Sequence, residues 1–305
     1  MPLVSVIMSA YKEKPNIFAE AVDSVLSQTF IDFEFIIALD APDNIELRQL
    51  IEGYANADSR VHPLFNNRNL GLAESLNNAI THSTGKYICR MDADDISLND
   101  RIERQLNWLT EADADLIGGE MIVVDGAGED LYVVNNLPSS PEKVNRALRW
   151  NNCVPHPTWL GKREIFESGY RCIPLCEDYD LLLRSALAGK KLSNGKGVVL
   201  KYRMGEDSIS RSNLYDQYLY MRYLTHAYAQ GKVVDLDAAA AWVSHRSTES
   251  KKLRYQSANE SFNLAMRRIE AREFIRAFGC LATIAFTSPA YVAKMFRLVF
   301  AALAL

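Results

Sequence analysis

Short apolar runs alternate with amphipathic stretches throughout the first hundred residues, and this alternation limits the fold more than any other feature. The apolar runs cover residues 4–10, 33–39, 61–65 and 87–91. The amphipathic stretches, with apolar side chains at helical spacing, cover residues 17–28, 46–54, 72–80 and about 100–109. Strands that alternate with helices in this way predict βαβ units and a mostly parallel sheet. Such sheets bind ligands where their strands end at the carboxyl edge. The loops expected to carry a site therefore follow Ala10, Leu39, Phe65 and Met91.

The pattern becomes mixed after about residue 114 and helical after about residue 212. Strands are predicted at 116–124 and 131–134, a helix at 177–187 and a last strand at 198–203. The stretches beyond 212 have apolar residues at helical spacing only. We therefore expect an α/β domain at 1–211 and a helical C-terminal region at 212–305.

Charge and cysteine content exclude some classes of protein. The chain of 305 residues has 34 Lys and Arg against 38 Asp and Glu, a net charge of −4, so the overall basic character of a nucleic-acid-binding protein is absent. The five cysteines lack the paired spacing of a zinc site, and the first residues have no basic stretch before their apolar run. These features lead us to expect reduced thiols in a cytoplasmic protein.

An acidic triplet, Asp92, Asp94 and Asp95 in MDADD, follows the apolar run at 87–91. Three carboxylates within four residues repel one another unless a cation or hydrogen-bond donors compensate them. Carboxylate oxygens suit Mg²⁺ or Mn²⁺, which bind through one or two carboxylates together with substrate phosphates. The alternative interpretation is an acidic cap for the helix at about 100–109.

Three more polar positions are candidates, each with a structural alternative. Asp40 ends the second apolar run, where an Asp is also a common turn former or helix cap. Glu177 and Asp178 open a helix, whose dipole favours carboxylates in its first turn, but one of them could also accept a proton. His156 lies between two prolines, which fix the backbone around it; a packed histidine is the alternative.

Six segments taken together resemble the family 2 glycosyltransferases, specifically bacterial enzymes that build exopolysaccharide, capsule or O-antigen units. The segments are VSVIMSAYKE, SVLSQTFIDFEFIIALD, NLGLAESLNNAI, GKYICRMDADDISLNDR, HPTW and EDYDLLLR, and they span about residues 3–211. The resemblance implies a GT-A fold, a Rossmann-like and mostly parallel sheet flanked by helices. It also implies a nucleotide-diphosphate-sugar donor, a divalent metal (Mn²⁺ or Mg²⁺) and inversion at the anomeric carbon.

The resemblance also assigns roles to individual residues. Ser9, Ala10 and Tyr11 would contact the nucleotide together with Asp40, while Asp92 would lie near the ribose. Asp94 would hold the metal.

On the acceptor side, Asp178 would be the catalytic base and His156 would line the site together with Glu177. Arg90 and Arg101 flank the acidic motif as partners for phosphate or, alternatively, as members of structural ion pairs.

One position departs from many relatives, which have two adjacent acids at the end of the second strand. This chain has Leu39 before Asp40, which weakens any assignment of the base that is read; UDP remains the default. Two alternatives stay open: a sugar-nucleotide nucleotidyltransferase and a catalytically inactive sugar-nucleotide-binding protein. The first is expected to have a Gly-rich, basic loop near the N-terminus, which the segment from Ser9 to Lys12 lacks.

The C-terminal region contains an uncharged stretch at 277–293. It is shorter than a spanning helix requires and contains Pro289, so we do not expect it to cross a membrane. It could lie in a membrane interface with Arg276, Lys294 and Arg297 towards the head groups, or pack as a core helix or a protein contact. The first interpretation predicts peripheral contact with the inner face of the plasma membrane, near lipid-linked acceptors.

Overall fold

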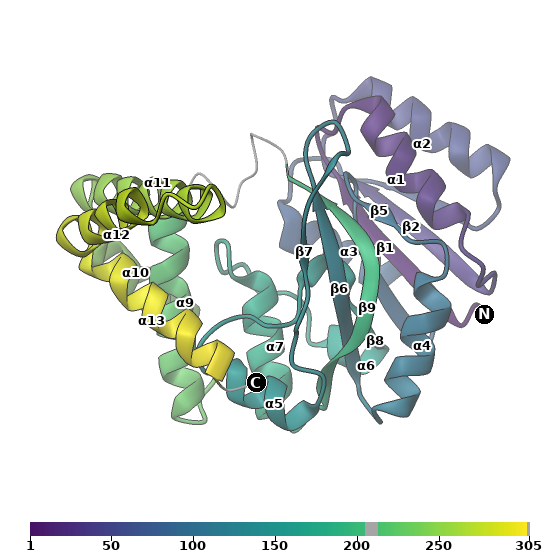
Figure 1. Ribbon diagram of the computed structural model, residues 1–305. Coiled ribbons are helices and arrows are strands. Elements are labelled where there is room, and N and C mark those ends of the chain that lie inside the picture. The colour runs from purple at the N-terminus through teal and green to yellow at the C-terminus, as the bar shows by residue number, and fades with distance from the viewer. Residues whose placement is uncertain (205–212, 304–305) are drawn as a thin grey trace. The chain divides into compact units, whose positions relative to one another are not determined.

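The computed structural model describes residues 1–204 and 213–303 (Figure 1). Contacts within the chain divide it into two compact units. We call the first the sheet unit; its described residues are 1–145, 152–172 and 177–204. We call the second the helical unit; its described residues are 146–151, 173–176 and 213–303.

Within the described residues, nine strands form one sheet in the order β3-β2-β1-β4-β8-β6-β9-β5, with β7 paired to β6. The strands are β1 (Val4–Ala10), β2 (Phe33–Leu39), β3 (Val61–Phe65), β4 (Tyr87–Asp92), β5 (Ile96–Ser97), β6 (Leu116–Val124), β7 (Asp130–Val134), β8 (Leu160–Lys162) and β9 (Leu192–Arg203). The pairs β1–β2, β2–β3, β1–β4 and β6–β9 are parallel. Strands β5, β7 and β8 run antiparallel to their neighbours. The mostly parallel sheet expected from the sequence is confirmed.

The helices of the sheet unit begin at residues that favour helix starts. They are α1 (Pro15–Leu26), α2 (Ile45–Ala57), α3 (Leu72–His82), α4 (Arg101–Glu111), α5 (Pro141–Ala147, whose last two residues belong to the helical unit), α6 (Arg163–Glu167) and α7 (Glu177–Leu187). Pro15 occupies the first position of α1, where its missing N–H costs nothing. The side chain of Asn44 caps α2 by accepting a hydrogen bond from the backbone N–H of Leu47 at 3.1 Å.

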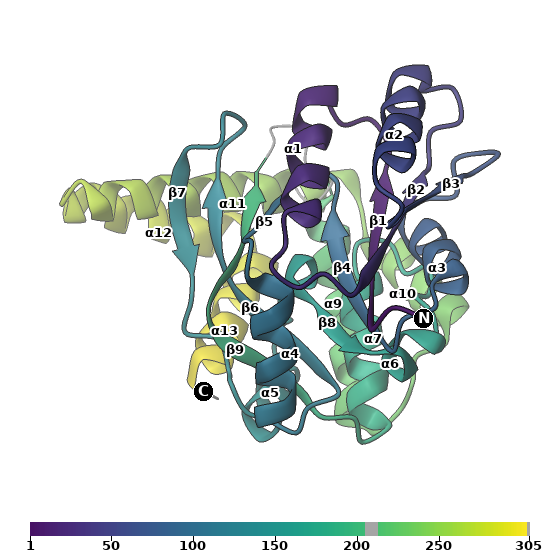
Figure 2. The ribbon, with the colours of Figure 1, turned by 90° about the vertical axis from the view of Figure 1, so that its right-hand side faces the viewer.

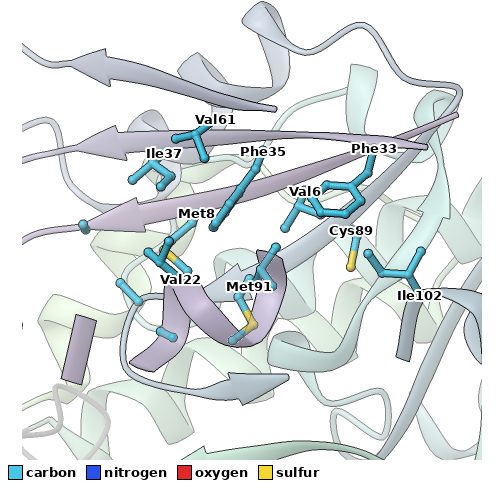
Figure 3. Packing of buried hydrophobic residues seen from close by; sticks show 14 of the residues in the cluster. Val6, Met8, Val22, Phe33, Phe35, Ile37, Val61, Cys89, Met91 and Ile102 are labelled. Atoms are coloured by element: carbon cyan, nitrogen blue, oxygen red, sulfur yellow. The ribbon is translucent and has the colours of Figure 1, made fainter. Parts of the chain in front are cut away.

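The main core lies between one face of the sheet and helices α1, α2 and α4, of which α1 and α4 stand in front of the strands in Figure 2. Alternate residues of the central strands, such as Val6, Met8 and Phe35, point into this core (Figure 3). Ile7 and Ile36 are also buried, because α3 packs against β1 and β2. Burial on both faces explains why these strands are almost continuously apolar in sequence.

Short elements of the middle region differ from the sequence prediction. Strands β5 and β8 and helix α6 contain too few residues for a pattern to repeat. Strand β9 begins at Leu192 rather than at 198. Its first half contains the polar and glycine residues SNGKG, which lack the apolar pattern that predicts a strand. These elements matter for function because β5 follows the acidic triplet directly.

The helical unit contains α9 (Leu214–Ala229), α10 (Leu236–Arg246), α11 (Glu249–Glu270), α12 (Phe274–Thr287) and α13 (Pro289–Leu303). Its core is rich in tyrosine, with Tyr215, Tyr218, Tyr255 and Tyr291 packed beside Ile284. In the described residues, no single helix is long and apolar enough to cross a membrane. Helices α12 and α13 reach that length and composition only as a pair, and a bend of 117° separates them.

Candidate active site

Three strands of the sheet unit end side by side, because β1 pairs in parallel with both β2 and β4. Ala10 lies opposite Leu39, and Ser9 lies opposite Asp92. Asp40 therefore follows β2 at the same edge at which Asp92 ends β4. This is the carboxyl edge, where sheets of this class bind ligands.

Asp92, Asp94 and Asp95 form a compact acidic cluster at the end of β4. One carboxylate oxygen from each residue lies within 4.8 Å of the others. Asp95 is fully buried, and its Oδ1 accepts a hydrogen bond from the backbone N–H of Arg203 at 2.8 Å. The alternative interpretation, an acidic cap for the next helix, is wrong: β5 intervenes, and Asp100 is the residue that precedes α4.

The electrostatics of the cluster favour binding of protons or of a cation over three ionised carboxylates without a counter-charge. Burial, and then the charges of Asp92 and Glu13, raise the pKa of Asp94 to about 7. Burial also raises the pKa of Asp95 well above its ordinary value, followed by the charges of Asp92 and Asp94. Asp95 Oδ2 is buried and has no hydrogen-bond partner among the described residues. This set of oxygen donors fits Mg²⁺ or Mn²⁺.

Arg90 is the buried cation beside this cluster. Its guanidinium forms an ion pair with Asp92, and its side chain is only 3% exposed. Its Nε and Nη1 have no hydrogen-bond partner among the described residues. The positive charge of Arg90 also opposes the rise in the pKa values of Asp94 and Asp178. Arg90 therefore acts electrostatically on both groups of acids.

Arg101 supports the backbone around Arg90, and its contact with a phosphate remains a prediction. It is buried, and its Nη2 donates hydrogen bonds to the carbonyl oxygens of Arg90 at 2.8 Å and Pro157 at 3.0 Å. Its Nε donates to Gln105 Oε1 at 2.9 Å. These contacts hold the backbone beneath Arg90.

Asp178 lies near the same arginine, at the start of α7. Its Oδ2 accepts a hydrogen bond from Asn152 Nδ2 at 2.8 Å, and its Oδ1 accepts one from the backbone N–H of Tyr179 at 2.6 Å. Desolvation raises the pKa of Asp178, which suits a group that must accept a proton. The charges of Asp178, Glu177 and Asp92 all raise the pKa of Tyr170. The acid pair of α7 and Asp92 of the acidic cluster therefore both act electrostatically on Tyr170.

His156 is packed among aromatic rings. It begins a 3₁₀ turn (His156–Thr158), and its Nε2 lies 2.9 Å from the hydroxyl oxygen of Tyr170. The rings of Trp159 and Tyr170 lie 4.6 and 5.4 Å from it, centroid to centroid. Burial and the charge of Arg90 lower the pKa of His156 well below its ordinary value, so its ring is neutral. Its acceptor-side role remains a prediction.

The carboxylate of Asp40 is used within the protein. Its Oδ1 accepts hydrogen bonds from Asn66 Nδ2 and from the backbone N–H of Leu70, and its Oδ2 accepts one from the backbone N–H of Gly71, all at 2.8 Å. Gly71 has a φ of +83°, which favours glycine, and precedes α3. Asp40 therefore holds the loop that leads into α3. A contact between Asp40 and a nucleotide would be additional to these three hydrogen bonds.

The three predicted nucleotide contacts at the end of β1 differ in exposure. Ser9 Oγ donates a hydrogen bond to Ser75 Oγ at 2.9 Å, and Ala10 is fully buried. Tyr11 follows the strand and exposes 38% of its surface. Its backbone N–H donates to Glu13 Oε2 at 2.7 Å. Of the three, Tyr11 is the residue whose side chain faces outward.

Sequence reasoning assigned no role to two groups that shape this site. Glu13 lies close enough to raise the pKa of Asp94, and Arg203 Nε donates a hydrogen bond to the backbone oxygen of Asp94 at 3.0 Å. The signal for Glu13 was present, since it stands just after the first strand in AYKE. Arg203 ends a distant strand, so only the fold could reveal it.

A cavity of about 540 Å³ lies beside the loop that Asp40 holds. Most of its lining residues have polar side chains, four asparagines and two charged residues of opposite sign among them, although carbon atoms form more of the lining surface than polar atoms do. The lining residues are Phe65, Asn66, Asn67, Arg68, Leu70, Glu74, Asn77 and Asn78. Hydrogen-bonding side chains set in a partly apolar surface suit a ligand with both characters, such as a sugar or a nucleobase.

Comparison with known proteins gives the family. Residues 5–169 match the family model described as glycosyl transferase family 2. An uncharacterized glycosyltransferase of Methanocaldococcus jannaschii is 31% identical over 76% of this chain and 81% of its own length. The O-antigen biosynthesis glycosyltransferase WbnJ of Escherichia coli is 30% identical over 70% of this chain and 84% of its own.

Solved structures give the same fold at lower identity. S. aureus TarS 1–349 in complex with UDP-GlcNAc is similar with a TM-score of 0.59 and 15% identity, over 99% of this chain and 88% of that one. The mannosyltransferase PcManGT of Pyrobaculum calidifontis, in complex with GDP-Man and Mn²⁺, has a TM-score of 0.53 and 16% identity, over 93% and 86%. The expected GT-A fold is confirmed, and the chain belongs to glycosyltransferase family 2.

Proposed function

We propose that this glycosyltransferase inverts the anomeric carbon of a sugar that it moves from a nucleotide-diphosphate donor, UDP by default, to an acceptor hydroxyl. The observation that carries the proposal is the shared position of Arg90, whose charge acts on the acidic cluster and on Asp178. On this proposal, the site for a metal-bound diphosphate would lie near the candidate base. Relatives named for O-antigen and amylovoran biosynthesis support a role in surface polysaccharide synthesis.

The donor assignment rests on the chemistry of the carboxyl edge and on similar structures. TarS is known with UDP-GlcNAc, whereas PcManGT is known with GDP-Man and Mn²⁺, so the fold accommodates more than one base. Because the carboxylate of Asp40 already accepts three hydrogen bonds from the segment before α3, we assign reading of the base to the cavity beside that segment. Arg68 is the cation among its lining residues.

The residues of the acidic cluster would hold the diphosphate through a divalent cation. Asp94, with Asp92 and Asp95 beside it, would bind Mn²⁺ or Mg²⁺. The bound cation supplies positive charge to the diphosphate oxygens as the leaving group becomes negative. Loss of preorganised charge stabilisation of this kind commonly costs about 10²–10³ in rate.

Asp178 would accept the proton of the acceptor hydroxyl. As the proton moves to a carboxylate oxygen, the hydroxyl oxygen attacks the anomeric carbon and the bond to the diphosphate oxygen breaks, so a single displacement inverts the centre. Asn152 orients the base through its hydrogen bond to Oδ2. The raised pKa of Asp178 strengthens it as a base, while Arg90 keeps it ionised.

We further assign the acceptor to a glycan or a lipid-linked saccharide, with Glu177 and His156 on that side of the site. The protein would then work in the cytoplasm at the inner face of the plasma membrane, reached by a peripheral contact of the C-terminal region. The names of relatives in surface polysaccharide synthesis support this placement.

The test separates donor binding from transfer. Asp178→Asn should keep its affinity for UDP with Mn²⁺ in calorimetry and lose about 10²–10⁴ in nucleotide release with acceptor present. Asp94→Asn should instead weaken metal-dependent binding of the nucleotide. Asp32→Asn is the matched control, because Asp32 is exposed just before β2, at the opposite end of the strands.

Each alternative predicts a different result from a panel of donors. Binding without release by the wild-type protein would indicate an inactive binding protein. Formation of a nucleotide sugar from a nucleoside triphosphate and a sugar phosphate would indicate a nucleotidyltransferase. Full turnover by Asp178→Asn would exclude Asp178 as the base.

A further inference from the structure

The outer face of helix α12 is apolar and uncovered in the described residues. Ile275, Phe278 and Phe286 are 90%, 73% and 91% exposed, and their spacing places them on one side of the helix. Ala277 and Ile284, on the other side, are buried, and Ile284 belongs to the core of the helical unit. Large apolar side chains gathered in this way mark an interaction surface rather than ordinary exposure.

The length of α12 restricts what this face can do. Its 14 residues span about 21 Å, less than the hydrocarbon core of a bilayer. The bend of 117° before α13 prevents the two helices from forming one straight rod. The outer face can therefore lie along a membrane surface.

Positive charge accompanies the apolar face. Residues 213–305 contain 12 Lys and Arg against 7 Asp and Glu, a net charge of +5 in a chain whose total is −4. No acidic residue follows Glu273. Arg267 and Arg272 are exposed at the end of α11 and just after it. The side chain of Arg276, in the first turn of α12, is 70% exposed and forms an ion pair with Glu273 at 3.2 Å. Such asymmetry of charge suits an anionic partner.

Two cations expected from the sequence to face head groups are used elsewhere. Arg297 Nη2 donates hydrogen bonds to the carbonyl oxygen of Trp150 at 2.6 Å and to Thr225 Oγ1 at 3.0 Å. Lys294 lies over the rings of Tyr255 and Tyr291. The exposed arginines before and within the first turn of α12 therefore carry the charge of this surface.

We propose that the outer face of α12 docks on an anionic lipid bilayer, with Ile275, Phe278 and Phe286 in the interface and Arg272 and Arg276 at the phosphate level. Apolar side chains beside arginines match the boundary between acyl chains and anionic head groups. A second copy of this chain would present the same positive rim and so lacks that complementarity. The proposal deepens the membrane contact under Proposed function and rests on it, but it does not depend on sugar transfer.

Vesicle flotation of the full chain tests the proposal. We expect binding to vesicles of phosphatidylcholine mixed with phosphatidylglycerol, and much weaker binding to phosphatidylcholine alone. The combined variant Ile275→Ser, Phe278→Ser and Phe286→Ser should reduce partitioning at least about tenfold, since three large side chains lose their burial. Arg276→Glu should reduce it roughly tenfold on the anionic vesicles only.

The matched control changes exposed leucines of α11 in the same unit. Leu253 and Leu264 are 66% and 40% exposed, and Leu253→Ser with Leu264→Ser should float as the wild type does. All these substitutions are at exposed positions, and circular dichroism verifies the fold. Wild-type flotation by the combined variant would overturn the proposal. So would a wild-type dimer that binds no vesicles and becomes a monomer in that variant.

Donor turnover in vesicle-free solution separates the two proposals. If the wild type releases UDP but does not float, the docking surface is wrong and sugar transfer stands. If it floats but releases no nucleotide from any donor, the docking surface stands and the transfer reaction is wrong.

Discussion

Asp94 carries the clearest electrostatic signature of the site. In the folded protein its pKa is about 7, against an ordinary value of 3.8, because the carboxyl is desolvated and faces Asp92 and Glu13. Between these two pH values the folded state retains a proton that the unfolded state has lost. The stability that this group contributes is therefore complete below pH 3.8 and is lost as pH rises towards 7.

We predict that, with a chelator present, this component of the free energy of unfolding falls between about pH 4 and pH 7. Urea denaturation at several pH values measures it, and Asp94→Asn should flatten that part of the curve. Because the cation competes with the proton, Mn²⁺ should bind more tightly as pH rises and restore the lost stability. Identical pH profiles for wild type and Asp94→Asn would contradict the prediction.

Among single residues, sequence reasoning could find the carboxylates but not what satisfies them. The acidic triplet was recognisable because three acids close together need a compensating group. In the sequence, Asp40 is likewise an acid at the end of a predicted strand. In the structure, however, its carboxylate accepts three hydrogen bonds from the segment before α3. Those donors lie some thirty residues away along the chain, so no local pattern reveals them.

At the scale of elements, helix α4 packs closely on strand β9 at Gly195. A Cβ atom at Gly195 would overlap the ring of Trp108, whose other neighbours include the guanidinium of Arg104 at 4.8 Å. Gly195→Ala should therefore lower the free energy of unfolding by about 1–3 kcal/mol, because the ring must leave its position. Chemical denaturation gives the value directly.

Gly53 supplies the opposite control within α2. A Cβ atom there meets nothing within 4 Å, so Gly53→Ala should raise the free energy of unfolding by about 0.5–1 kcal/mol through better helix propensity. If Gly195→Ala does not lower the free energy of unfolding, the close packing of α4 on β9 does not limit stability.

Elements with several apolar residues at a regular spacing were predictable from the sequence, whereas elements that form only by pairing with another strand were not. The strands β1 to β4 and their helices were evident because each buries several residues at a regular interval. Strand β5 has two residues, Ile96 and Ser97, and exists only because β9 pairs with it. Its position directly after Asp95 fixes the acidic cluster, so part of the site depended on an element that has no sequence signal.

At the scale of the molecule, the two units have separate cores. Met91 is buried in the core of the sheet unit, directly before Asp92, and its sulfur accepts a hydrogen bond from Arg101 Nη1 at 3.4 Å. Ile284 is buried in the core of the helical unit. Truncating either to alanine should cost about 2–5 kcal/mol of stability by leaving a cavity.

The two truncations should nevertheless differ in their effect on nucleotide binding. Met91→Ala removes support beneath the acidic cluster and should weaken binding of UDP with Mn²⁺, because sites displaced by a fraction of an ångström lose their ligand geometry. Ile284→Ala should leave that affinity unchanged, since the cluster, Arg90 and Asp178 all belong to the sheet unit. Calorimetry below the melting temperature of both variants measures the difference. Equal losses of affinity would show that nucleotide binding depends on the integrity of both cores.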